Sequence, residues 1–260
     1  MSLSNPKQSI SSPVKRYYKW NADKGQMAYY DKETETTVLV DEPFKMIPVD
    51  QFSCVEGYNA KAGKGFRSNE VKSTKNEDFI VNWNGGGNII TGKYADIKEK
   101  IESLGGKYHS SIYFATPIDG KLELCNLRIK GAGMSAWLDL NKTIKSGVEG
   151  NQLTVTKSEL QKTGKVEYYS PVFKISKPTM EDYNAAVELD RDLQEYIKRR
   201  VEMKTQTEEE FLGSDVDSTP LTEDEKKQLK KPTTKKTEKW ERHWFEADEE
   251  SEEDLFNSIN

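Results

Sequence analysis

The sequence has few of the residues on which the commonest catalytic and metal-binding sites depend. Its 260 residues include two cysteines, Cys54 and Cys125, and two histidines. The cysteines lie far apart and form no CxxC pair, which excludes a zinc finger and a disulfide scaffold and favours a reducing compartment. Two histidines leave little scope for acid–base chemistry, and HExxH, GxSxG and HRD-like motifs are absent. We therefore expect a binding protein rather than an enzyme, without a metal ion or a cofactor.

Long apolar runs are also missing. The mean hydropathy is −0.84, and the chain is 34% hydrophobic and 32% charged, which indicates that part of it does not fold compactly. No stretch approaches the roughly 20 apolar residues that cross a bilayer. The first residues, MSLSNPKQSISSPV, lack a hydrophobic signal region. These absences predict a soluble intracellular protein without membrane contact.

One apparent nucleotide-binding motif lacks a residue that the motif requires. Residues 87–93 fit the pattern GxxxxGK, but Tyr94 stands where a P-loop needs Ser or Thr for magnesium. Ile89 and Ile90 within it are strand formers rather than loop formers. We interpret the glycines of residues 84–87 as a turn between two strands.

The most informative stretch is residues 107–130, KYHSSIYFATPIDGKLELCNLRIK. Two apolar and aromatic runs flank Asp119-Gly120, which is a strong signal for a β-hairpin. Upstream, Tyr94, Ile97, Ile101 and Leu104 recur at helical spacing before two glycines, which predicts a short amphipathic helix.

These elements predict a mainly β fold with added helices, arranged as an OB-fold-like β-barrel. The order is strand, strand, strand, helix, strand, strand, with the helix between the third and fourth barrel strands. We divide the chain into a flexible start (1–13), an OB-like domain (14–177), a helix packed on it (178–203), a flexible linker (204–239) and a disordered acidic tail (240–260). Thr179 is expected to cap the long helix, and a second, shorter helix is expected around Trp137.

Charge is distributed unevenly along the chain. Residues 1–177 hold 26 basic and 20 acidic residues, a net charge of +6, whereas residues 178–260 hold 13 and 24, a net charge of −11. Such asymmetry points to a polyanion-binding body with an acidic regulator. The apolar tip of the tail, Leu255, Phe256 and Ile259, suggests a docking peptide, the alternative being a plain solubilising tail.

Basic and aromatic residues alternate in the body, most clearly in residues 16–20 and in the glycine-rich stretch 57–67, which we expect to be a loop beside the ligand face. Core packing is the alternative for each aromatic, and a solvated turn is the alternative for the loop. The candidate stacking residues are Trp20, Tyr58, Phe66, Tyr108 and Tyr113. The candidate phosphate contacts are Arg16, Lys19, Lys61, Lys64, Arg67, Lys107, Arg128 and Lys130.

The runs YYKW, PFKMIPVDQF, GKYADIKEKI, GGKYHSSIY, LRIKGAGMSAWLDL and YYSPVFK resemble a family of bacteriophage single-stranded DNA-binding proteins found in crAss-like and other Bacteroidetes phages. The resemblance covers about residues 15–200. This chain departs from related phage proteins in having no zinc-ligand set, and its tail ends in NSIN rather than in an acidic-Phe tip.

The resemblance implies that the protein coats single-stranded DNA during phage replication or recombination, in the cytoplasm of the infected bacterial host. The charge split in turn predicts that the acidic tail occupies the DNA groove in the absence of DNA and is freed to dock replication or recombination proteins when DNA is bound. The alternative is a phage structural or assembly protein that does not bind nucleic acid. A DNA binder should gather its cations on one face, whereas a structural protein should scatter them.

Overall fold

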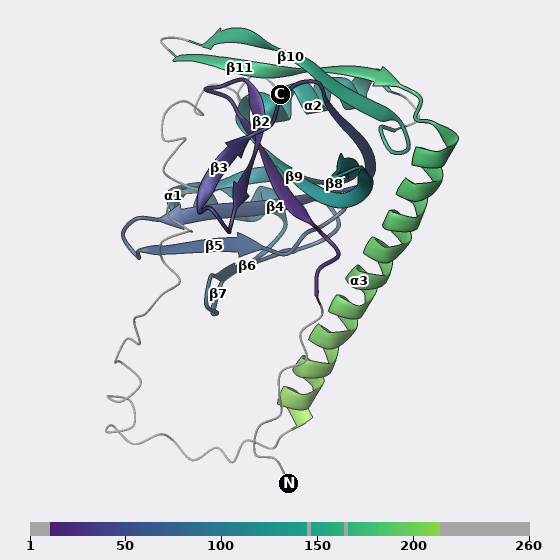
Figure 1. Cartoon of the computed structure of the whole chain (residues 1–260). Coiled ribbons are helices and arrows are strands. Elements are labelled where there is room, and N and C mark those ends of the chain that lie inside the picture. The colour runs from purple at the N-terminus through teal and green to yellow at the C-terminus, as the bar shows by residue number, and fades with distance from the viewer. Residues whose placement is uncertain (1–10, 145–146, 164–165, 214–260) are drawn as a thin grey trace.

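The computed structural model describes residues 11–144, 147–163 and 166–213. In this part of the chain, eleven strands form one sheet that curls into a half-barrel, and three helices lie against it (Figure 1). The expected fold class, mainly β with a C-terminal helix, is confirmed. None of these helices combines the length and apolar character that crossing a bilayer requires.

The strands follow one another along the chain with short connections. They are β1 (Arg16–Asn21), β2 (Gln26–Asp31), β3 (Thr36–Leu39), β4 (Phe44–Asn59), β5 (Lys64–Ser68), β6 (Phe79–Trp83), β7 (Asn88–Gly92), β8 (Gly106–Ile118), β9 (Lys121–Ile129), β10 (Gln152–Thr163) and β11 (Val166–Ser176).

The sheet is organised around the long strand β4. The path of paired strands is β3-β2-β1-β9-β8-β4-β5-β6-β7, and the β10–β11 hairpin branches from the first residues of β4. All the pairs are antiparallel except β1 with β9, which run parallel. The sheet is therefore an open half-barrel, since the path ends at β3 and β7, and it has more strands than the five of a simple OB barrel.

The central hairpin and its turn form as expected. β8 pairs with β9 from Ser110–Ile129 to Ile118–Lys121, and Asp119 and Gly120 have φ values of 51° and 81°, as a tight hairpin turn requires. Gly85, Gly86 and Gly87 also have positive φ and connect β6 to β7. The GxxxxGK residues therefore lie on a turn and a strand, not on a P-loop.

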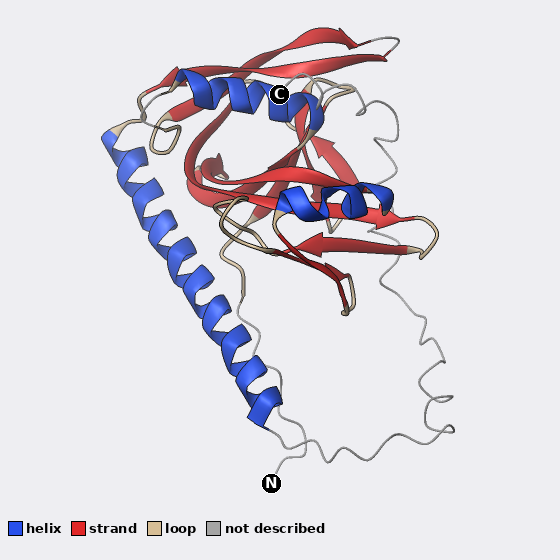
Figure 2. Cartoon of the chain, turned by 180° about the vertical axis from the view of Figure 1, so that it is seen from behind, coloured by secondary structure: helices blue, strands red, loops and turns tan. Residues whose placement is uncertain are grey.

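Helices α1 (Tyr94–Ser103) and α2 (Gly131–Thr143) match the two short helices expected from the sequence. Figure 2 shows α1 lying against the sheet and α2 beside the β10–β11 hairpin. Ile97 and Ile101 of α1 and Trp137 of α2 are buried, because the apolar side of each helix faces the half-barrel.

Helix α3 (Met180–Gly213) begins as expected, since the Thr179 hydroxyl accepts a hydrogen bond from the Asp182 N–H at 3.1 Å. It ends later than the expected residue 203, so the linker does not begin at 204. The reason is that residues 204–212 contain no proline or glycine and include good helix formers, whereas Gly213 can end a helix.

The sheet has two faces with different neighbours. The inner face carries the main core, which includes Tyr18, Ile112, Phe114 and Leu127 and is closed by α2 and β10, with a second cluster under α1. The outer face carries the alternate side chains of the same strands. Helix α3 packs on one part of this outer face and leaves the rest of it for the candidate site.

Candidate nucleic-acid interface

Strand register places basic side chains from neighbouring strands on the outer face. Lys19 of β1 is the partner of Arg128 on β9, and Arg128 is the partner of Ser111 on β8. Lys107 lies four residues from Ser111 on the same strand, so its side chain points to the same face. Three strands therefore contribute one cation each to this surface.

The same register continues to β4 and β5. Lys107 is the partner of Glu56, and Glu56 is the partner of Arg67 on β5, with no bulge between these positions. Arg67 is exposed. We call this part of the outer face the basic face; its defining residues are Lys19, Arg67, Lys107 and Arg128 with Tyr17, Glu56 and Tyr58.

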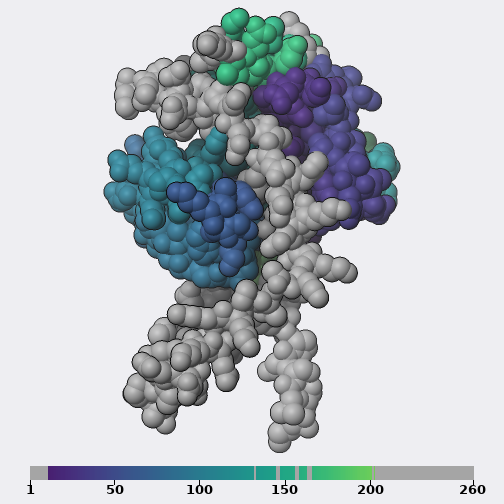
Figure 3. All heavy atoms as spheres, turned by 90° about the vertical axis from the view of Figure 1, so that its left-hand side faces the viewer, coloured from purple at the N-terminus to yellow at the C-terminus, as the bar shows by residue number. Residues whose placement is uncertain are grey.

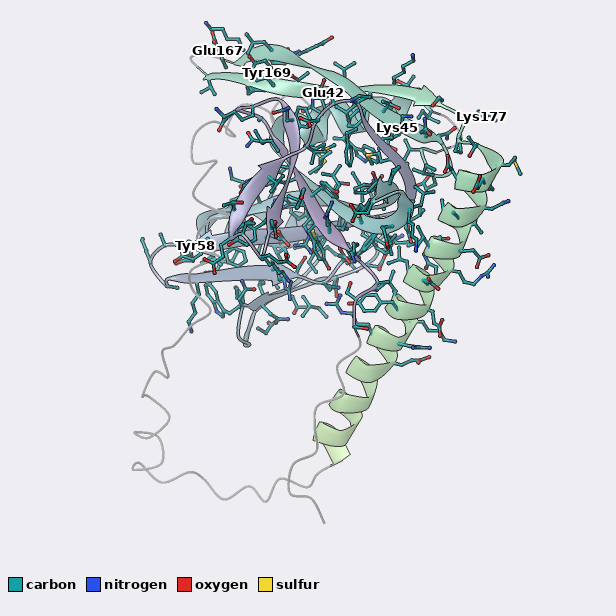
Figure 4. All side chains as sticks on the ribbon, in the orientation of Figure 1. Glu42, Lys45, Tyr58, Glu167, Tyr169 and Lys177 are labelled. Carbon is teal, nitrogen blue, oxygen red and sulfur yellow. The ribbon has the colours of Figure 1, made fainter. Side chains whose placement is uncertain are left out.

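Tyrosines accompany the cations on the basic face. Tyr17 alternates with the buried Tyr18, is 43% exposed, and has its ring 5.7 Å from Arg128 Cζ. Tyr58 follows Glu56 by two residues and is half-buried. Figure 4 labels Tyr58 at the end of β4, beside β5. These two rings are therefore the aromatic surfaces next to the cations.

An ion pair crosses the middle of the basic face. Arg128 Nη1 contacts Glu56 Oε1 across β8, and the two side chains are 27% and 17% exposed. Burial raises the pKa of the Cys54 thiol to about 12; the positive charges of Arg128 and Arg67 oppose that rise, and the negative charge of Glu70 adds to it.

A polar network lies on the same outer face, next to Arg128. Glu70 accepts hydrogen bonds from the Ser111 hydroxyl at 2.5 Å and the Tyr113 hydroxyl at 2.7 Å, and Asn126 donates to Ser111 at 2.8 Å. Burial, followed by the charge of Glu70, raises the pKa of Tyr113. Backbone bonds between Val71 and β4 hold Glu70 in place. Asn126 Oδ1 is buried without a hydrogen-bond partner among the described residues, but the other bonds of the network link β8 and β9, the strands that carry Lys107 and Arg128.

Helix α3 forms the border of the basic face. Its residue Leu193 packs with Phe52, Tyr113 and Leu124, and the charge of Arg200, two turns further on, acts on the Tyr113 hydroxyl. Tyr113 is therefore covered by the helix and cannot stack on a base. Arg200, which is exposed on α3, adds a cation at the edge of the site.

Three further candidate stacking residues belong to the inner face, and this corrects the sequence interpretation. Phe66 is 1% exposed and packs under α1, so residues 57–67 are two paired strands joined by a short turn rather than a loop. Trp20 is buried and donates its indole N–H to the Tyr169 carbonyl at 2.8 Å. Tyr108 is half-buried, and its hydroxyl lies 2.6 Å from Ser53 Oγ.

The remaining candidate cations divide between other places. Arg16 lies on the inner face, with its guanidinium 4.6 Å above the Tyr29 ring, so it is not part of the basic face. Lys61 and Lys64 are exposed at the β4–β5 turn, next to the face but not on it. Lys130 follows Arg128 by two residues, so it has the same position in the strand alternation, and it is the residue directly before α2. In Figure 3, the N-terminal strands (purple) and the β5–β8 region (blue to teal) lie on opposite sides of the view.

The tail candidates Leu255, Phe256 and Ile259 lie outside the described residues. Among the residues that are described, no group of three His, Cys, Asp or Glu side chains could hold a metal ion.

Sequence reasoning missed Tyr17 and Glu56 as members of the site. The alternation in residues 16–21, RYYKWN, could have identified Tyr17. Tyr18 and Trp20 point to one face of the strand, whereas Tyr17 and Lys19 point to the other. Glu56 gave no such signal, since its cationic neighbours come from three other strands.

Comparisons of the chain with protein-family models, with curated proteins and with solved structures found no match.

Proposed function

We propose that this protein binds single-stranded DNA without strong sequence preference. One observation supports this most: register gathers Lys19, Arg128, Lys107 and Arg67 from four different strands on one face, beside Tyr17 and Tyr58. These cations do not contribute to the main core, because their side chains point away from it.

The chemistry of this face suits a flexible polyanion. Lysine and arginine side chains neutralise phosphates, and tyrosine rings offer surfaces on which any base can stack, worth about 1–3 kcal/mol per base. From β1 to β5 the face crosses four strand spacings, or about 19 Å at 4.8 Å each. A curled sheet with α1 just before β8 is consistent with the OB-like barrel that we propose as its finer description.

The proposed role is to coat unwound DNA during phage replication or recombination in the cytoplasm of the infected bacterial host, without turnover. This role rests on the sequence resemblance. The acidic tail, residues 240–260 with a net charge of −7, is proposed to compete with DNA for the basic face and to dock replication or recombination proteins through Leu255, Phe256 and Ile259. A tethered tail has an effective concentration near millimolar, so a weak contact suffices.

The test is a fluorescence-anisotropy titration of labelled oligo-dT with the full chain at several salt concentrations. If about four phosphates are neutralised, log affinity should fall with log salt with a slope near −2.8. Truncation after Lys239 should raise affinity, most strongly at low salt where charges are least screened. An oligonucleotide of mixed sequence should bind about as well as oligo-dT.

Absence of measurable binding at about 50 mM salt, with and without the tail, would refute the proposal. That outcome would favour the structural or assembly role, in which the basic face contacts an acidic surface of another protein.

A further inference from the structure

Glu56 has an unusual position within the basic face. Its cross-strand partners on the two neighbouring strands are Lys107 and Arg67, and its carboxylate forms the ion pair with Arg128. One carboxylate therefore lies among three cations that come from β8, β5 and β9. These four side chains carry a net charge of +2, and the Glu70 carboxylate, hydrogen-bonded to Ser111 beside Arg128, lowers the net charge of this part of the face to +1.

The Glu56 carboxylate presents to Arg128 the same chemistry as a phosphate. Both groups offer a pair of anionic oxygens on one central atom, to which a guanidinium donates charge-assisted hydrogen bonds. The pair does not use all the donors of Arg128, since its Nε is buried and has no hydrogen-bond partner among the described residues. At 17% exposure, the Glu56 side chain is shielded from solvent and screened weakly by salt.

We infer that Glu56 is a specificity-determining residue that stands in for a ligand phosphate and limits the affinity of the basic face. The inference rests on the proposed function. In the protein without DNA, Glu56 holds Arg128 and offsets the mutual repulsion of the three cations. When DNA binds, a phosphate must share Arg128 with Glu56 or displace Glu56 from it. A single anion therefore competes poorly with Glu56, whereas a strand with several phosphates can displace it.

The principal test is Glu56→Gln, which removes the charge with little change of shape. Affinity for oligo-dT should rise about tenfold at 50 mM salt, and the slope of log affinity against log salt should become steeper by about 0.7, the value for one more neutralised phosphate. The matched control is Glu99→Gln, which removes the same charge from an exposed position on α1, on the opposite face of the sheet. This control should leave affinity within twofold of the unmodified protein.

A second readout does not depend on DNA. The melting temperature of Glu56→Gln should be lower than that of the unmodified protein. Inorganic phosphate should raise the melting temperature of Glu56→Gln more than it raises the melting temperature of the Glu99→Gln control. Should Glu56→Gln fail to fold, Glu56→Asp is measured instead. It keeps the charge but moves it away from Arg128, and its oligo-dT affinity should increase by severalfold.

The outcomes separate the two proposals. If the unmodified protein binds oligo-dT and Glu56→Gln binds it equally or more weakly, the inference is overturned and DNA binding stands. If neither protein binds oligo-dT, the proposed function fails. In that case, preferential stabilisation of Glu56→Gln by phosphate would retain Glu56 as a phosphate surrogate, and its absence would overturn the inference as well.

Discussion

Replacing Phe66 by alanine should destabilise the fold rather than remove a DNA contact. The Phe66 ring lies against Gly57 and Gly106, which are partners in the β4–β8 pair, and it meets the Trp83 ring edge-to-face at a centroid distance of 5.7 Å. The neighbouring glycines have no side chains that could move into the vacated space. Truncation should therefore leave a cavity that does not close.

The expected cost follows from this geometry. Phe→Ala replacements in cores cost about 3–5 kcal/mol, and a site that cannot collapse belongs to the upper part of that range. At about 2–4 °C per kcal/mol for a domain of this size, 4–5 kcal/mol corresponds to a fall of about 8–20 °C in Tm. The measurement is urea unfolding followed by circular dichroism and tryptophan fluorescence.

Tyr58→Ala is the matched control, because Tyr58 lies one residue from Gly57 in the same strand but points to the basic face. It should cost much less stability and should lower affinity for oligo-dT. If instead Phe66→Ala leaves the urea midpoint unchanged and weakens DNA binding, Phe66 is a stacking residue and the assignment of the two faces is wrong.

The remaining predictions concern Gly57, the two cysteines and Thr179. Gly57→Ala should cost at least about 2 kcal/mol in urea unfolding, because its Cβ would lie 2.5 Å from the Cα of Gly106. Burial raises the pKa of both Cys54 and Cys125 from 9.0 to about 12, so neither thiol should react with a thiol reagent at pH 8 until urea unfolds the chain. The folded state holds both protons more tightly, so this stability is present below pH 9 and should decline as pH rises toward 12, which urea midpoints across that range can detect. Thr179→Ala should cost about 1 kcal/mol through loss of the α3 cap, again by urea unfolding, whereas Thr179→Ser should be neutral.

Local patterns predicted the local structures well. The Asp119-Gly120 turn, the amphipathic helix α1, the helix around Trp137 and the Thr179 cap each depend on residues close together in sequence. Their signals are carried by turn chemistry and periodicity, which a single sequence contains in full.

The site depends on contacts that a single sequence does not contain. Phe66 stands in a stretch rich in glycine and lysine, which predicts a loop, but its ring packs against the strand backbone at Gly57 of β4 and Gly106 of β8. Tyr113 is covered because α3, far along the chain, packs over it. Glu56 meets its cations only through the pairing of four strands. Register and helix placement decide these cases, and neither can be read from alternation alone.

The most direct test of the central claim reverses the charge of the basic face. The variant Lys19→Glu/Arg67→Glu/Lys107→Glu changes three strands of that face, and the control Lys32→Glu/Lys100→Glu/Lys121→Glu makes the same change of net charge at exposed positions elsewhere. Anisotropy titrations with oligo-dT at 50 mM salt should show at least a tenfold loss of affinity for the first variant only. Its salt slope should be shallower by about 2, the value for three lost phosphate contacts. Equal losses in both variants, or no loss in either, would contradict the assignment of DNA binding to this face.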